Sequence, residues 1–167
     1  MTRNSLTRIG LLPATVLVAG LIGLGIVAGP VPVYANIDQD AFSAGEPGDP
    51  TKSARILNVT MKDAGGKLTF DPALVKVRLG EQIRFVVANA DQLDHEFFLG
   101  SPDDISEHAD MMKTFPDMEH SDPNVIRLKP GETKEIVWHF TKAGDFEYAC
   151  LLPGHLEAGM LGKVVVE

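Results

Sequence analysis

Near its C-terminus the chain reads Asp145-Phe-Glu-Tyr-Ala-Cys150-Leu-Leu-Pro-Gly-His155-Leu-Glu-Ala-Gly-Met160. This stretch contains the only cysteine of the protein and places Cys150, His155 and Met160 at equal steps of five residues. The alternating aromatic residues before Cys150 are typical of a strand. A thiolate and an imidazole bind copper in either oxidation state, and a thioether is soft enough to be a weak further ligand. The stretch therefore predicts a strand followed by a copper-binding loop, with a fourth ligand supplied by a distant histidine.

Apolar residues that alternate with polar ones predict further short strands upstream of this loop and one after it. Gly-containing turns separate several of these segments. Seven or so short strands with a single helical interruption describe an all-β fold, a β-sandwich with Greek-key connections. The expected strands lie within residues 55–61, 75–79, 83–87, 95–99, 125–128, 135–140, 146–150 and 163–167.

One of these strands begins with the histidine that the loop requires. His95 and Phe97 share a face of the expected strand 95–99, so an imidazole opens an otherwise apolar face. Two histidines, one cysteine and a distant axial methionine form the ligand set of mononuclear blue-copper centres. We therefore expect one type 1 copper per chain, with His95, Cys150, His155 and Met160 as its ligands.

Two other interpretations of the loop stay open. Zinc fits less well, because a thioether is a poor zinc ligand and structural zinc sites prefer more thiolates. Alternatively, Cys150 is a buried free thiol whose His and Met neighbours in the sequence are unrelated to it. A strand histidine such as His95 is, taken alone, more often a structural residue than a ligand.

The segment 101–122 interrupts the strand pattern and predicts one short helix. Ser101 followed by Pro102 and Asp104 indicates a capped start, and the helix should end before Pro116. Two interpretations of its sulfur and imidazole groups stay open: a weak additional copper site, or a Met112 that packs the helix onto the sandwich while the histidines are solvated. The groups concerned are His108, Met111, Met112, Met118 and His120.

Residues 1–35 resemble an export signal. Arg3 and Arg8 precede a long apolar run, and Val33-Tyr34-Ala35 offers a small-residue cleavage site. Because the run is long enough to span a bilayer, an uncleaved anchor is the alternative, although we favour cleavage. The expected location is the periplasm, with no stable membrane span after cleavage. A lone cysteine in an exported chain cannot form an internal disulfide, which favours a metal-bound thiol.

Cleavage after Ala35 would leave 132 of the 167 residues, in two parts. Residues 36–54 are polar, rich in Gly and Pro, and predicted to be a flexible N-terminal arm, whereas residues 55–167 form the folded domain. The first 35 residues contain two basic and no acidic side chains, so the formal charge changes from −8 to −10. Such an acidic chain is not expected to bind nucleic acid.

The ligand loop resembles that of the cupredoxins, the type 1 copper proteins, and the likeness extends over residues 55–167. The Cys-x4-His-x4-Met spacing is like that of rusticyanin and auracyanin and longer than the Cys-x2-His-x4-Met of plastocyanins. A closer likeness is to the periplasmic cupredoxins of bacterial copper-tolerance clusters. It rests on His95-Glu-Phe, Glu107-His-Ala-Asp-Met-Met112, Phe115-Pro-Asp-Met-Glu-His120-Ser-Asp-Pro and the Cys150 loop. Such proteins often have a His- and Met-rich N-terminal arm, whereas residues 36–54 contain neither residue.

These observations predict a one-electron carrier rather than an enzyme. Leu151, Leu152 and Leu156 around His155 suggest an apolar patch where a redox protein, such as a cytochrome or a copper oxidase, could dock on a monomer. Ordinary loop packing explains these leucines equally well. The resemblance adds an alternative role in copper tolerance, in which the protein binds or oxidises surplus periplasmic copper. A copper enzyme such as a nitrite reductase or a multicopper oxidase is disfavoured, because it needs further copper centres and usually further domains. This chain has the length of one domain and no second set of His-x-His ligand motifs.

Overall fold

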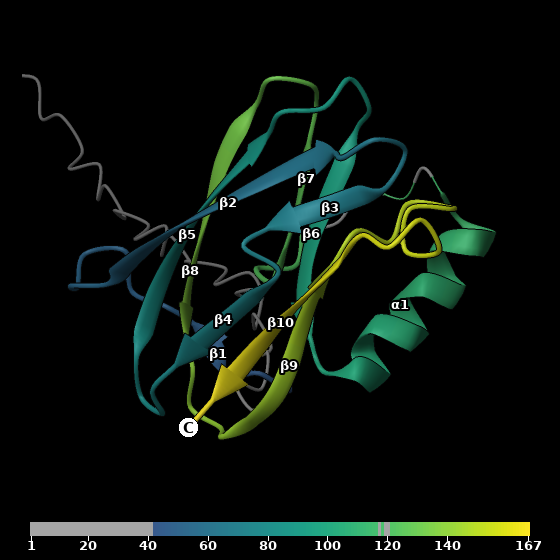
Figure 1. Cartoon of the computed structure of the whole chain (residues 1–167). Helices are drawn as coiled ribbons and strands as arrows, with labels where there is room; N and C mark the ends of the chain where they lie inside the picture. Colours follow the sequence, from purple (N-terminus) through teal and green to yellow (C-terminus); the bar gives the residue numbers. More distant parts are fainter. Residues whose placement is uncertain (1–41, 117, 119–120) are drawn as a thin grey trace, which may run out of the picture. The chain divides into compact units, whose positions relative to one another are not determined.

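The computed structural model describes residues 42–116, 118 and 121–167. The predicted signal at 1–35, the start of the predicted arm at 36–41, and His120 lie outside the described residues. In this part of the chain, two five-stranded sheets make up the fold, with one helix beside them (Figure 1). This arrangement confirms the predicted all-β sandwich with one short helix. Among the described residues, no helix is both long and apolar enough to cross a membrane.

The first sheet has the strand order β1-β8-β5-β2-β3. β5 pairs with β2 in parallel and with β8 in antiparallel orientation. Buried and partly exposed residues alternate along the whole of β5, which is the pattern of a strand with one face on the core. The strand bounds are β1 (Glu46–Pro47), β2 (Arg55–Asp63), β3 (Leu68–Asp71), β5 (Gln82–Asn89) and β8 (Thr133–His139).

The second sheet has the order β4-β10-β9-β6-β7 and carries the candidate ligands. β9 lies between β6 and β10 and is antiparallel to both, which brings the start of β6 close to the end of β9. Every residue of β6 is buried, because one face meets the core and the helix α1 (Pro102–Thr114) packs near the other. The strand bounds are β4 (Leu74–Val77), β6 (His95–Gly100), β7 (Val125–Leu128), β9 (Gly144–Ala149) and β10 (Leu161–Val166).

Large aromatic side chains fill the space between the sheets. Phe97 of β6 stacks on Tyr148 of β9 with ring centroids 5.2 Å apart, and Phe70 meets Tyr148 edge-on at 5.1 Å. Phe85 and Phe140 extend this aromatic cluster across β5. These rings are buried and close-packed, so they hold the ends of β6 and β9 in a fixed relation.

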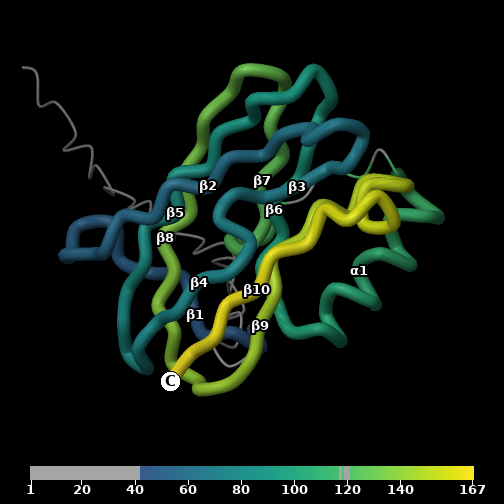
Figure 2. The backbone as a smooth tube through the Cα atoms, in the orientation of Figure 1, coloured from purple at the N-terminus to yellow at the C-terminus, as the bar shows by residue number. Residues whose placement is uncertain are grey.

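Helix α1 (Pro102–Thr114) begins and ends where its sequence predicts. The Ser101 side chain accepts a hydrogen bond from the Asp104 backbone N–H, and the Asp104 carboxylate accepts one from the Ser101 N–H. Ile105, His108 and Met112 form its buried face. In Figure 2 the loop between β9 and β10 lies beside this helix, and residues of both line one small cavity. The helix therefore covers β6 and borders the ligand loop.

The N-terminal part of the described chain makes specific contacts with the first sheet. β1 pairs with the end of β8, and the Gly48 N–H donates to the Val137 carbonyl at 2.8 Å. The Trp138 indole N–H donates to the Ala44 carbonyl at 3.3 Å, and the Phe42 ring meets Trp138 edge-on. From residue 42 onward, the segment that its composition predicts to be a flexible arm is thus attached to the sandwich.

Candidate metal centre

Two neighbouring strands position the first two candidate ligands. His95 is the first residue of β6, and Cys150 follows the last residue of β9. Both side chains are fully buried. Because the neighbouring strands β6 and β9 pair through Phe98 and Ala149, the imidazole and the thiol lie at the same end of the sheet.

The loop after Cys150 folds back on itself and presents His155. Its backbone is closed by hydrogen bonds from the His155 N–H to the Leu152 carbonyl and from the Met160 N–H to the His155 carbonyl, both at 3.0 Å. Gly154 has a φ of +86°, a left-handed conformation that other residues rarely adopt. The Cys150 N–H donates to the Met160 carbonyl at 3.2 Å, so the two ends of the loop are joined.

Three candidate ligands meet at one point in the structure. Cys150 Sγ lies 3.2 Å from His155 Nδ1 and 3.9 Å from His95 Nδ1, and the two Nδ1 atoms are 3.1 Å apart. Among the described His, Cys, Asp and Glu residues, these three form the one group able to hold a metal ion. Metal–nitrogen bonds of about 2.0 Å and metal–sulfur bonds of about 2.3 Å in a trigonal arrangement put donors roughly 3.5 to 3.7 Å apart. The observed spacing therefore fits a single metal bound by two imidazoles and a thiolate.

Met160, the predicted axial ligand, is fully buried directly before β10. Its backbone bonds to His155 and Cys150 hold it at the base of the ligand loop. Its thioether as a fourth, weak ligand stays a prediction.

The Cys150 sulfur lies in a buried environment with a backbone donor. Burial raises the pKa of the Cys150 thiol to about 12, although backbone N–H groups of Glu96 and Leu152 act in the opposite direction. The Glu96 N–H donates to Sγ at 3.2 Å. In the metal-free protein the thiol therefore keeps its proton at neutral pH, and a metal that binds the thiolate must displace it.

His155 is the more exposed of the two imidazoles. It is partly buried, whereas His95 is fully buried, and burial lowers the pKa of His155 so that the neutral, ligating form is favoured.

The leucines of the predicted docking patch separate into two groups: Leu151 and Leu152 belong to the core, and Leu156 is only partly buried. Loop packing thus explains the first two, and the exposed part of the patch is reduced to Leu156 with Pro153 and Gly154.

Three polar residues near the centre were not predicted as functional. Asp91 Oδ2 lies 2.9 Å from His95 Nε2, and the buried Asn89 accepts a hydrogen bond from the Asp91 N–H. Glu96 is fully buried beside the first ligand. The sequence gives only weak signals for them: a polar turn before His95, and an acid inside an apolar strand.

The helix residues considered for a second copper site are divided between core and surface. Met112 is fully buried, as in the packing interpretation. His108 is also buried, although that interpretation expected it to be solvated. Its ring stacks on Phe98 at 4.4 Å, with Nε2 3.6 Å from Glu96 Oε1. Met111 is exposed and Met118 partly buried. Among the described His, Cys, Asp and Glu residues, His108 belongs to no group of three or more that could hold a metal ion.

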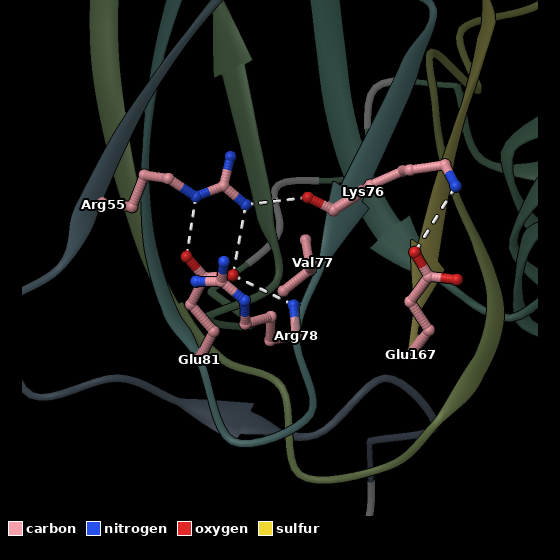
Figure 3. A pocket seen from close by; sticks show the side chains of 6 residues that line it. All are labelled: Arg55, Lys76, Val77, Arg78, Glu81 and Glu167. Carbon is pink, nitrogen blue, oxygen red and sulfur yellow. Dashed lines mark hydrogen bonds and ion pairs between the residues drawn. The ribbon is translucent and has the colours of Figure 1, made fainter.

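The site does not coincide with the pocket drawn in Figure 3. That cavity of about 380 Å³ is lined by Arg55, Lys76, Val77, Arg78, Glu81 and Glu167, none of which is a candidate ligand. Arg55 donates to both carboxylate oxygens of Glu81, at 2.7 and 3.2 Å, and to the Lys76 carbonyl. These acids are paired with cations, so this pocket offers no comparable set of metal donors.

Comparisons with known proteins agree with the geometry. The family of copper-binding proteins described as plastocyanin/azurin matches residues 57–167. The copper-resistant cuproprotein CopI of Rubrivivax gelatinosus is 52% identical over 122 residues, which cover 73% of this chain and 72% of that protein. CopI of Pseudomonas aeruginosa is 31% identical over 187 aligned residues, covering 93% and 98%. Among solved structures, auracyanin B superposes with a TM-score of 0.59 at 20% identity, covering 75% of this chain and 96% of auracyanin B. The auracyanin match supports the fold.

Proposed function

This chain belongs to the plastocyanin/azurin family of copper-binding proteins, and we propose that it is an exported periplasmic protein that transfers single electrons through one type 1 copper. The proposal rests on one observation: a buried cysteine sulfur with two imidazole Nδ1 atoms at 3.2 and 3.9 Å. Copper bound at these atoms supplies one-electron chemistry through its Cu(I) and Cu(II) states.

The protein itself restricts the movement of the ligand atoms and excludes water from them. His95 and Cys150 lie at the ends of paired strands above a close-packed aromatic core, so they cannot move far when the charge at the centre changes. Burial of both side chains excludes water. Met160 is proposed as a fourth, weak ligand, whose thioether would adjust the reduction potential.

Electron exchange would occur at the partly exposed His155. A redox protein of the cytochrome or copper oxidase class could approach the loop around Pro153, Gly154 and Leu156. We propose a monomeric carrier rather than an enzyme, because electron transfer of this kind needs contact with a partner and no substrate pocket beside the copper.

A spectrum of the copper-loaded protein tests the centre. Cu(II) should give an intense visible band from thiolate-to-copper charge transfer, and Cys150→Ser should lose essentially all of it. His139→Gln is a matched control, because His139 bonds to Glu46 away from the centre and its loss should leave the band unchanged. No band in the wild-type protein would refute the proposal.

A second candidate function is copper tolerance, in which the same centre binds or oxidises surplus periplasmic copper. It is favoured by the relatives at 52% and 31% identity, both named copper-resistant cuproproteins. Deletion of the gene should lower survival under added copper, and complementation with the wild type, but not with Cys150→Ser, should restore it. Unchanged survival of the deletion strain would leave electron transfer as the better proposal.

A further inference from the structure

We propose that Asp91 is a positioning residue of the copper centre, whose carboxylate orients His95 and favours Cu(II) over Cu(I). The inference rests on the proposed function, because it assumes copper at His95, Cys150 and His155. It adds a charged partner outside the ligand set, and that partner affects the reduction potential.

The contact between Asp91 and His95 fixes the tautomer of the ligand. Asp91 Oδ2 is 2.9 Å from His95 Nε2, with the His95 side chain fully buried and the Asp91 side chain 9% exposed. A carboxylate accepts and cannot donate when ionised, so Nε2 carries the hydrogen. Nδ1 is then the unprotonated nitrogen, and it is the atom that faces Cys150 Sγ and His155 Nδ1.

The turn between β5 and β6 holds this carboxylate in place. Asn89 is 2% exposed, and its Oδ1 accepts a hydrogen bond from the Asp91 N–H at 2.9 Å. Asn89 Nδ2 donates to the carbonyls of Leu93 and Leu128, at 2.8 and 3.1 Å, which ties the turn to β7. The Gln92 N–H donates to Asp91 Oδ1 at 2.6 Å. Both carboxylate oxygens are therefore fixed, and Asp91 cannot rotate away from His95 without losing a bond.

Asp91 is ionised in this environment. Its Oδ1 accepts a hydrogen bond from the Gln92 N–H, and its Oδ2 faces the ring nitrogen Nε2 of His95, so both oxygens have nitrogen partners that suit a charged carboxylate. The Asp91 charge thus lies one imidazole ring away from the metal position.

Charge balance gives the direction of the effect. With the Cys150 thiolate and the Asp91 carboxylate each at −1, a Cu(II) centre has a total charge of zero and a Cu(I) centre a total of −1. A net charge inside a poorly polarisable interior is unfavourable. Asp91 therefore stabilises Cu(II) relative to Cu(I) and lowers the reduction potential.

The test compares Asp91→Asn with Asp94→Asn in the copper-loaded full-length protein. Both changes remove one charge from the same turn, but Asp94 is 40% exposed and 3.6 Å from Arg127 rather than at a ligand. In a redox titration followed by the visible band, Asp91→Asn should increase the affinity for Cu(I) relative to Cu(II) at least tenfold, which raises the reduction potential by about 59 mV. Asp94→Asn should shift the reduction potential by less than a third of that amount.

An unchanged potential in Asp91→Asn, or an equal shift in Asp94→Asn, would overturn the inference. If Asp91→Asn loses the visible band and Asp91→Glu keeps it, the result supports the positioning role of Asp91. If both variants lose the band, the inference is overturned. If the wild type has no band, the proposed function fails, and nitrogen NMR of the copper-free protein still decides on Asp91. The wild type should carry hydrogen on His95 Nε2, and Asp91→Ala should shift hydrogen to Nδ1; identical spectra would contradict the positioning role.

Discussion

Glu96 is a carboxylic acid buried beside the candidate ligand His95, and its protonation state differs between the folded and the unfolded protein. Its backbone N–H donates to Cys150 Sγ, while its side chain lies under α1, with Oε1 3.6 Å from His108 Nε2. Burial raises the pKa of Glu96 to about 7, with the nearby Arg127 acting in the opposite direction. Folding of the copper-free protein therefore favours the protonated acid.

Glu96→Gln should change how stability depends on pH. Between pH 4.5 and 7 the folded protein holds a proton on Glu96 that the unfolded chain releases, so wild-type stability falls as pH rises through this window. The variant lacks this loss. Its free energy of unfolding relative to wild type should rise by about 3 kcal/mol from pH 4.5 to pH 8. Urea titrations of both copper-free proteins at several pH values measure this difference, and a difference that does not vary with pH would contradict the prediction.

Single residues divide into those that spacing could predict and those it could not. Cys150, His155 and Met160 lie close in sequence, and His95 stands out as an imidazole on an apolar strand face, so ligand chemistry alone selected them. The structure brings the three strong donors together. Asn89 and Asp91 lie at the end of β5 and in the turn that follows it, whereas Glu96 lies in β6 between β7 and α1. The contacts of Glu96 with Cys150 and His108 and of Asn89 with Leu128 join distant segments, so no local pattern indicates them. Asp91 is only four residues from His95, but its contact depends on the conformation of the turn between them.

At the scale of elements, α1 is the part whose limits follow most directly from local rules. The Ser101 and Asp104 side chains accept hydrogen bonds from each other's backbone N–H groups, and Pro102 has no N–H that would need an acceptor. This start of the helix requires no other part of the chain. The Ser43 hydroxyl also donates to the Asp104 carboxylate, which links the helix start to the N-terminal segment. That second contact could not be predicted from the helix sequence.

Ser101→Ala should destabilise the protein by about 1 kcal/mol, because the Asp104 N–H loses its acceptor. Ser106→Ala is the matched control: Ser106 is exposed in the same helix, and its replacement should be neutral or slightly stabilising. Chemical unfolding of both variants measures the difference. Equal stability of the two variants would mean that the cap contributes nothing.

The sequence predicts best those strands in which apolar and polar residues alternate regularly. β5 and β8 have one face on the core and show the expected period of two. β6 is buried on both faces, so its sequence does not alternate cleanly. Its polar first residue, His95, indicates a ligand only when it is considered together with the Cys150 loop. β1 has two residues and no apolar period, and it exists only because β8 offers a partner.

At the scale of the whole described molecule, the N-terminal segment closes the edge of the first sheet. The Gln82 side chain bonds to both the N–H and the carbonyl of Asp49, and Arg84 donates to the Pro50 carbonyl. Composition predicts a flexible arm here, because the segment has too few apolar residues to form a core of its own. Its stability comes instead from Trp138 and β8, about ninety residues away in the chain.

Two shortened chains, beginning at Phe42 and at Arg55, test this attachment. The chain from Arg55 loses the hydrogen bonds to Val137 and from Trp138 and the Phe42–Trp138 ring contact, which together should cost about 3 kcal/mol. Trp138 is the only tryptophan and is fully buried, so its fluorescence should move to longer wavelength in the Arg55 chain alone. None of the lost contacts involves His95, Cys150 or His155, so both chains should keep the copper band. If the Arg55 chain matches the Phe42 chain in stability and fluorescence, residues 42–54 are a free arm after all.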